Sequence, residues 1–170
     1  RFDAFEPDMQ RLFISRLTLQ RRLTAAILSS DFEQFYQPQF NIKTGKLRGF
    51  EALLRWHDSE LGNVPPSLFI PVAEETGLIL PIGKWVMKTA LVMLKRWQTL
   101  YDYEGIMSIN VSPMQLKQES FIPELNDLIA ENNLDPSTIE IEITEGVMIE
   151  NMNAAIESLN ALKKKGIRIS

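Results

Sequence analysis

The sequence contains no cysteine and a single histidine, His57. Without cysteine, the chain can form neither a disulfide framework nor a thiolate metal site. One imidazole cannot form a metal site built on histidines, and nucleophilic triads that need cysteine or a placed histidine are excluded as well. We therefore expect His57 to lie at the surface or in a loop.

The chain also lacks long apolar runs and an excess of positive charge. No run of about 18 apolar residues occurs, so no segment is expected to span a membrane, and no secretory signal is visible. The formal net charge of −4 offers no basic field to a nucleic acid polymer. No Gly-x-Gly-x-x-Gly follows a strand, and no Walker-type loop is present, so the nucleotide-binding folds that use these loops are not expected. We expect a cytoplasmic domain, although its parent protein could be attached to a membrane.

The composition, with 45% hydrophobic and 24% charged residues among 170, is that of an ordinary globular domain or part of one. Because the chain begins at Arg1 rather than Met, we expect it to belong to a longer protein. Residues 1–30 are predicted to form an N-terminal helical linker, and residues 31–170 the folded domain. The linker contains four arginines expected on a solvated helix face: Arg11, Arg16, Arg21 and Arg22.

A β-hairpin opens the folded domain. Strands are predicted at 35–42 and 47–56, with a turn at 43–46, and Pro38 places the first strand at an edge. The order then alternates between helix and strand: a helix or loop at 67–77, helix 82–100, strand 105–111, helix 124–132, strand 138–144, helix 153–165 and a strand from Ile167. Ser112-Pro113-Met114-Gln115 resembles a capping box. The alternation predicts an α/β fold with parallel strands, either a barrel or an open sheet.

The second hairpin strand contains two charged residues in an apolar stretch. Strand alternation places Glu51, Leu53 and Arg55 on one face, and Phe50, Ala52, Leu54 and Trp56 on the other. Glu51 and Arg55 would lie about 13 Å apart along the strand. This separation is too long for an ion pair, but it would allow the two side chains to hold two parts of one ligand.

Two later strands also carry polar residues near their C-terminal ends, where α/β folds build their sites. Asn110 lies in the strand 105–111, and Glu140 and Glu142 lie in the strand 138–144. Carboxylate and amide oxygens suit Mg²⁺ or Mn²⁺ better than zinc. Three structural alternatives remain open: both glutamates facing water on an edge strand, Asn110 capping a turn, or Glu51 paired with a lysine.

Several separated segments together resemble the EAL domain family of bacterial cyclic di-GMP phosphodiesterases. In chain order they are Tyr36-Gln37-Pro38, Glu51-Ala52-Leu53-Leu54-Arg55-Trp56, the segment 69–79, Ser108-Ile109-Asn110-Val111-Ser112 and Glu140-Ile141-Glu142-Ile143-Thr144-Glu145. The family fold is a modified (β/α)8 barrel with an antiparallel first strand. The resemblance therefore implies an incomplete TIM-like barrel, with residues 31–170 as the N-terminal two-thirds of an EAL domain.

The resemblance also implies roles for particular residues. Glu51, Asn110 and Glu142 would be ligands of Mg²⁺ or Mn²⁺, and Glu145 would be a supporting residue that fixes a neighbouring active-site loop. The residues expected to contact cyclic di-GMP are Gln37, Leu54 and Arg55, with Arg55 on a phosphate. A GGDEF or sensor domain would be fused upstream, and a homodimer is a further expectation.

Two functions follow from the resemblance. The full-length protein would hydrolyse cyclic di-GMP to linear pGpG; alternatively, it would be a catalytically inactive receptor or a protein-interaction module. Family members continue with an Asp-Asp-Phe-Gly-Thr-Gly run and a lysine, whereas this sequence stops at Ser170, about where that run begins. We therefore expect the 170-residue chain alone to be inactive.

Overall fold

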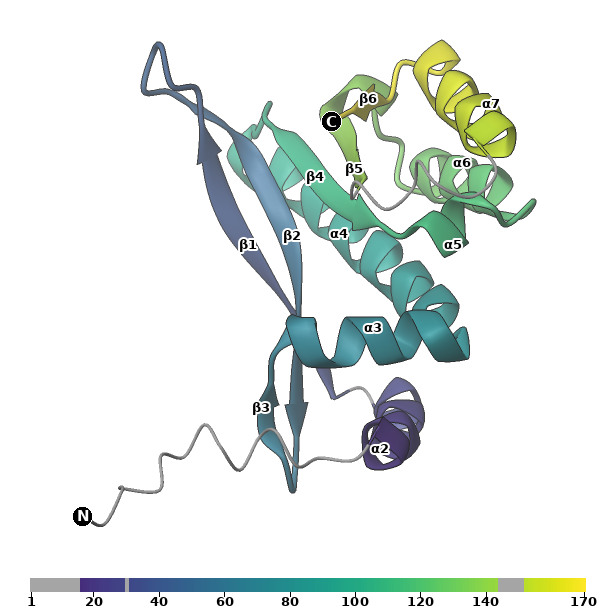
Figure 1. Cartoon of the computed structure of the whole chain (residues 1–170). Coiled ribbons are helices and arrows are strands. Elements are labelled where there is room, and N and C mark those ends of the chain that lie inside the picture. Colours follow the sequence, from purple (N-terminus) through teal and green to yellow (C-terminus); the bar gives the residue numbers. More distant parts are fainter. Residues whose placement is uncertain (1–15, 30, 144–151) are drawn as a thin grey trace.

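A computed structural model describes residues 16–29, 31–143 and 152–170, which form one mixed sheet and its helices (Figure 1). None of the described helices is long and apolar enough to cross a membrane. The elements are α2 (Arg16–Ser29), β1 (Phe32–Phe40), β2 (Leu47–Asp58), β3 (Gly62–Val64), α3 (Pro66–Thr76), α4 (Ile79–Tyr101), β4 (Ile106–Val111), α5 (Pro113–Leu116), α6 (Phe121–Glu131), a 3₁₀ turn (Pro136–Thr138), β5 (Ile139–Ile143), α7 (Met152–Lys164) and β6 (Arg168–Ile169).

The strands lie in the order β1-β2-β4-β5-β6, and β3 pairs with the far end of β2. β1 runs antiparallel to β2, whereas β2, β4, β5 and β6 are parallel to their neighbours. The predicted α/β fold with an antiparallel first strand is confirmed. Pro38 lies in β1, whose partner within the described residues is β2 alone, as expected for an edge strand. The three-residue strand β3 was not predicted, because its sequence has no alternating pattern.

α4 packs along one face of the sheet (Figure 1). Aromatic side chains contribute to this contact. Trp97 of α4 lies 4.9 Å, between ring centroids, from both Tyr36 of β1 and Phe50 of β2. Trp85, also on α4, contacts Phe32 at 6.0 Å. The face predicted for Phe50, Ala52, Leu54 and Trp56 is therefore the helix-covered one, and Glu51, Leu53 and Arg55 point to the opposite face.

The two edges of β2 are used by different partners. Along one edge β2 pairs with β1; along the other it pairs with β4 at Gly49–Ala52 and with β3 at Trp56–Asp58. At the start of β2 the backbones lie very close, since a Cβ added to Gly49 would lie 2.3 Å from the carbonyl oxygen of Ile106. The β1–β2 register skips Arg48, which marks an irregularity such as a β-bulge.

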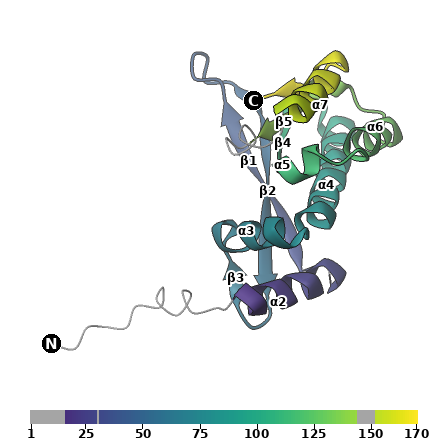
Figure 2. The same cartoon turned by 45° about the vertical axis from the view of Figure 1, so that its right-hand side comes forward.

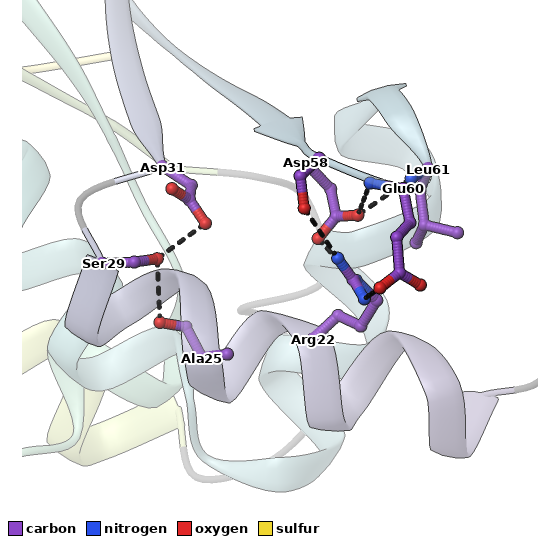
Figure 3. Close-up of polar contacts among 8 residues, drawn as sticks. Arg22, Ala25, Ser29, Asp31, Asp58, Glu60 and Leu61 are labelled. Atoms are coloured by element: carbon purple, nitrogen blue, oxygen red, sulfur yellow. Dashed lines mark hydrogen bonds and ion pairs between the residues drawn. The ribbon is translucent and has the colours of Figure 1, made fainter.

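α2 and α3 lie together at the end of β2 that pairs with β3 (Figure 2). Leu19, Leu23 and Ala26 of α2 are buried in the core. Arg22 donates to Asp58 at 2.7 Å and pairs with Glu60 at 2.6 Å (Figure 3). The expectation that the arginines occupy a solvated helix face is therefore wrong for Arg22, whose side chain is only 16% exposed.

Asp58 is the buried partner in this cluster, and its Oδ1 accepts hydrogen bonds from the amides of Glu60 and Leu61 (Figure 3). Burial alone would raise the pKa of the carboxyl group. The hydrogen bonds from Arg22, Leu61 and Glu60 outweigh that effect, so the pKa of Asp58 lies below its usual value.

The predicted capping box after β4 is confirmed. The amide of Gln115 donates to Ser112 Oγ at 3.3 Å, and the amide of Ser112 donates to Gln115 Oε1 at 3.1 Å. The Gln115 side chain is buried and packs against Gly83 of α4. A Cβ added to Gly83 would lie 2.0 Å from Gln115 Nε2. The contact fixes the chain directly after β4 against α4.

We predict that Asp58→Asn makes stability less dependent on pH. A carboxyl whose folded pKa is lowered stabilises the protein above its unfolded pKa of about 3.9, and this contribution is lost as the pH falls through the folded pKa. In urea titrations from pH 6 to pH 3, the stability difference between wild type and Asp58→Asn should shrink. Glu75→Gln, which breaks an exposed ion pair with Arg16, should give a small difference at every pH. A constant gap for Asp58→Asn would contradict the assignment.

We predict that Gly83→Ala lowers the free energy of unfolding by about 1–3 kcal/mol. The added methyl group would displace the buried amide of Gln115, which is held in place by the hydrogen bond from the Ser112 amide. Helix propensity alone predicts the opposite sign, a gain of about 1 kcal/mol. Chemical denaturation measures the change. In the Gln115→Ala background the clash is absent, so there the same glycine substitution should be neutral or stabilising. Equal effects in both backgrounds would exclude the steric explanation.

Candidate metal and ligand site

Glu51, Asn110 and Glu142 lie on three neighbouring strands, β2, β4 and β5. Asn110 and Glu142 are direct partners in the parallel register, and each is the second-last residue of its strand. Asn110 Nδ2 donates to Glu51 Oε1 at 2.7 Å. The tertiary structure thus brings together residues that are 59 and 32 positions apart in the sequence.

The donor atoms of this group are of the type that a hard divalent cation prefers. Because the Asn110 amide nitrogen faces Glu51, its carbonyl oxygen remains available as a ligand. Two carboxylates and one carboxamide oxygen are typical ligands of Mg²⁺ or Mn²⁺. Within the described ranges, no three His, Cys, Asp or Glu residues group as a metal site, so the asparagine is needed to make three donors.

The structure rejects the three structural alternatives that the sequence left open. β5 lies between β4 and β6, so Glu140 and Glu142 do not occupy an edge strand. Ser112, not Asn110, caps the turn that follows β4. In the described part of the chain, Glu51 forms no ion pair with a lysine and instead accepts the hydrogen bond from Asn110.

Glu140 and Glu142 point to the same side of β5 but differ in their partners. Glu140 is buried and forms a bidentate ion pair with Arg48, at 2.5 and 2.8 Å, and it also accepts from Ser108 at 2.8 Å. Burial would raise the pKa of Glu140, but the bonds from Arg48 and Ser108 prevail and lower it. Glu142 is half-buried and accepts from the neutral amide of Gln39 at 3.1 Å. Its charge therefore remains available to a cation.

Arg48 and Gln39 are functional candidates that the sequence analysis did not identify. Strict alternation would place Arg48 on the face opposite Glu51, and the skipped register position allows it to reach Glu140 instead. No local pattern in the sequence indicates that irregularity. The partners Arg48 and Glu140 are also 92 residues apart, beyond the reach of a pattern read along one strand.

Arg55 and Leu54 line a cavity of about 250 Å³ beside Asn110. The apolar wall of this cavity comes from α3 and α4, with Ile70, Ile79 and Val86 among its lining residues. The guanidinium of Arg55 donates to the carbonyl oxygen of Leu54 at 2.9 Å and lies 5.5 Å from the centroid of the Phe35 ring. A guanidinium group has five N–H donors, so this arrangement can still bind an anionic group.

Three other residues were singled out from the sequence: Gln37, His57 and Glu145. Gln37 is exposed on β1, and its partner in the register is Glu51, so it lies next to the metal-binding candidates. His57 is exposed, as expected, and its Nδ1 lies 2.9 Å from Asn63 Oδ1. Glu145 lies outside the described residues.

The profile of the EAL domain matches residues 20–170. Protein sll1895 of Synechocystis is 37% identical over 166 residues, which are 98% of this chain and 24% of that protein. The cyclic di-GMP phosphodiesterase PA2567 of Pseudomonas aeruginosa is 33% identical over 167 residues, covering 98% of this chain and 28% of the relative. The chain thus spans about a quarter of the length of these relatives.

Solved structures of a phosphodiesterase and an EAL enzyme also superimpose on this chain. The complex of the PaMucR phosphodiesterase with c-di-GMP superimposes with a TM-score of 0.83 at 29% identity, covering 89% of this chain and 61% of that one. The EAL enzyme Bd1971, in a form with cAMP and cyclic di-GMP bound, gives a TM-score of 0.82 at 31% identity, with 97% and 44% covered.

We predict that Arg48→Met lowers the free energy of unfolding by about 1–3 kcal/mol, because it leaves the buried carboxylate of Glu140 without its cation. The double variant Arg48→Met/Glu140→Leu should recover part of this loss, since it removes both charges. Urea denaturation measures both effects. Lys84→Met, which breaks an exposed pair with Glu124, should cost less than about 1 kcal/mol. If Arg48→Met cost no more than this control, the pair would be unimportant for stability.

Proposed function

The chain belongs to the EAL domain family, and from this membership we propose that the full-length protein containing it binds cyclic di-GMP and hydrolyses one of its phosphodiester bonds. One observation carries the proposal. Glu51, Asn110 and Glu142 converge on adjacent strands, beside a cavity that Leu54 and Arg55 line. A metal-binding set of oxygen donors next to a guanidinium suits a phosphodiester ligand.

We assign the metal-binding role to Glu51, Asn110 and Glu142, with Mg²⁺ or Mn²⁺ as the cation. A divalent metal held there would activate a water molecule and stabilise negative charge on the phosphoryl oxygens. In the overall reaction the water oxygen bonds to phosphorus and the bond to one ribose oxygen breaks. The product is the linear dinucleotide pGpG.

The ligand-binding role falls to three further residues. Arg55 supplies N–H donors for a phosphate, and the fork geometry of its guanidinium allows two parallel hydrogen bonds to one phosphate group. Leu54 offers an apolar contact for a base at the cavity, and Gln37 offers an exposed amide beside Glu51. For Glu145 we propose the supporting role that the family resemblance implies.

The protein that contains this chain is proposed to carry further domains, such as a GGDEF or sensor domain upstream. The proposal is supported by the relatives, of whose length the matched region makes up about a quarter. Such an arrangement would couple a signal to the turnover of cyclic di-GMP, with residues 31–170 belonging to the EAL domain.

We predict that isothermal titration will detect cyclic di-GMP binding, and that Arg55→Ala will weaken it at least about tenfold. The expected loss corresponds to one charge-assisted hydrogen bond. Ca²⁺ should be present during the titration, so that binding is measured without turnover. Arg96→Ala is the matched control, because it removes an equally charged side chain that is exposed on α4. Its dissociation constant should equal that of the wild type.

The catalytic step is tested separately, in the protein that contains this chain with Mg²⁺ or Mn²⁺. Formation of pGpG is expected, and Glu51→Ala should abolish it while the domain remains folded. Binding without turnover would instead support a receptor. A folded sample that gives no heat signal with cyclic di-GMP would contradict the proposal as a whole.

A further inference from the structure

Gln39 connects the buried ion pair of Arg48 and Glu140 to the metal-binding candidate Glu142. We propose that Gln39 is a positioning residue that orients the Glu142 carboxylate toward the cation, and that Arg48 in turn fixes the orientation of Gln39. The inference rests on the proposed function, because it takes Glu142 to be a metal ligand. The contacts that carry it are independent of any bound group.

The two ends of the Gln39 amide have different partners. Its nitrogen donates to Glu142 Oε1 at 3.1 Å, across 103 residues of sequence. Its oxygen accepts from Arg48 Nη1 at 3.1 Å and lies 3.2 Å from the hydroxyl oxygen of Ser108. The three partners come from three other strands, so the Gln39 amide links β1 to β2, β4 and β5.

These partners allow only one orientation of the amide. A flipped amide would turn its NH₂ group toward the guanidinium of Arg48 and its oxygen toward the carboxylate of Glu142. Both contacts would then be repulsive, because Arg48 has only donors and ionised Glu142 only acceptors. The Gln39 nitrogen therefore has to face Glu142, and the orientation does not depend on a bound ligand.

Arg48 is itself held in place. Its guanidinium binds Glu140 through two parallel hydrogen bonds, and Glu140 is buried beneath the site with Ser108 as a further donor. A planar guanidinium bound at both ends to one carboxylate has little rotational freedom. The N–H group that remains for Gln39 is therefore fixed by a contact outside the metal-binding residues.

The donor next to Glu142 is a neutral amide, so it does not neutralise the carboxylate. An arginine or lysine in the place of Gln39 would neutralise the carboxylate and compete with a metal ion. The amide of Gln39 holds one carboxylate oxygen, Oε1, and leaves the second oxygen to the cation. Arg48 acts directly on Glu142 only through the field of its charge, because its ion pair is with Glu140. Glu140, whose charge is matched by Arg48, does not compete for the same ion.

The test compares Gln39→Met with Gln34→Met in Mn²⁺ titrations of the folded protein, without nucleotide. Gln34 lies on the same strand but on the opposite face, where it donates to the carbonyl oxygen of Val86 at 3.4 Å. Each substitution removes an amide of the same size, so the two melting temperatures should fall by similar small amounts. We expect Gln39→Met to weaken Mn²⁺ binding about 10- to 100-fold, as for other residues that orient metal ligands. Gln34→Met should bind Mn²⁺ like the wild type.

Glu142→Ala distinguishes a failure of the proposed ligand set from a failure of the positioning role. Loss of Mn²⁺ binding in Glu142→Ala together with wild-type affinity in Gln39→Met would overturn the positioning role and leave the proposed ligand set intact. Unchanged affinity in both variants would overturn both the ligand set and the positioning role. An equal loss in Gln39→Met and Gln34→Met would show a general effect on the sheet and would also overturn the inference.

Discussion

β2 and β4 approach so closely that a Cβ at Gly49 would meet the carbonyl oxygen of Ile106 at 2.3 Å. In this pairing Glu51 lies beside Ser108, and the separate pairing of β4 with β5 places Asn110 beside Glu142. A slip by one residue would turn every side chain of the strand to the other face. The metal-binding candidates would then face α4 instead of one another. The geometry of the site thus depends on backbone pairing that begins at a residue with no side chain.

Glu140 and Glu142 lie on the same side of β5, but their carboxylates have different partners. Glu140 is buried and matched by Arg48, whereas Glu142 contacts the neutral amide of Gln39. Removing a carboxylate from water is costly unless a cation or hydrogen bonds compensate, so the buried glutamate needs its arginine. The half-buried glutamate nearer the strand end can keep its charge for a ligand. Position along the strand and access to solvent therefore suit Glu140 to a structural role and Glu142 to the binding role proposed for it.

Helix α4 packs on the opposite face of the sheet, and α2 packs at the end of β2 that contains Asp58. α4 covers the hairpin with aromatic contacts, and Gln115, packed on Gly83, anchors the segment that follows Asn110. α2 is attached to the end of β2 through Arg22 and Asp58. Since β2 also carries Glu51 and Arg55, this helix is connected by one continuous strand to the proposed site. The arrangement agrees with that of EAL domains solved with cyclic di-GMP.

Local alternation, turn residues and short motifs were enough to predict the α/β class, the antiparallel hairpin, the capping box at Ser112 and the family. The sequence also singled out Glu51, Asn110 and Glu142 as polar residues in apolar strands, although it left their surroundings open. The inner position of β5 and the pairing of Arg48 with Glu140 became visible in the folded structure. The structure also showed Gln39 in contact with Glu142. The contacts of Arg48 and Gln39 join residues 92 and 103 positions apart through strand order and an irregular register, and no local pattern encodes either.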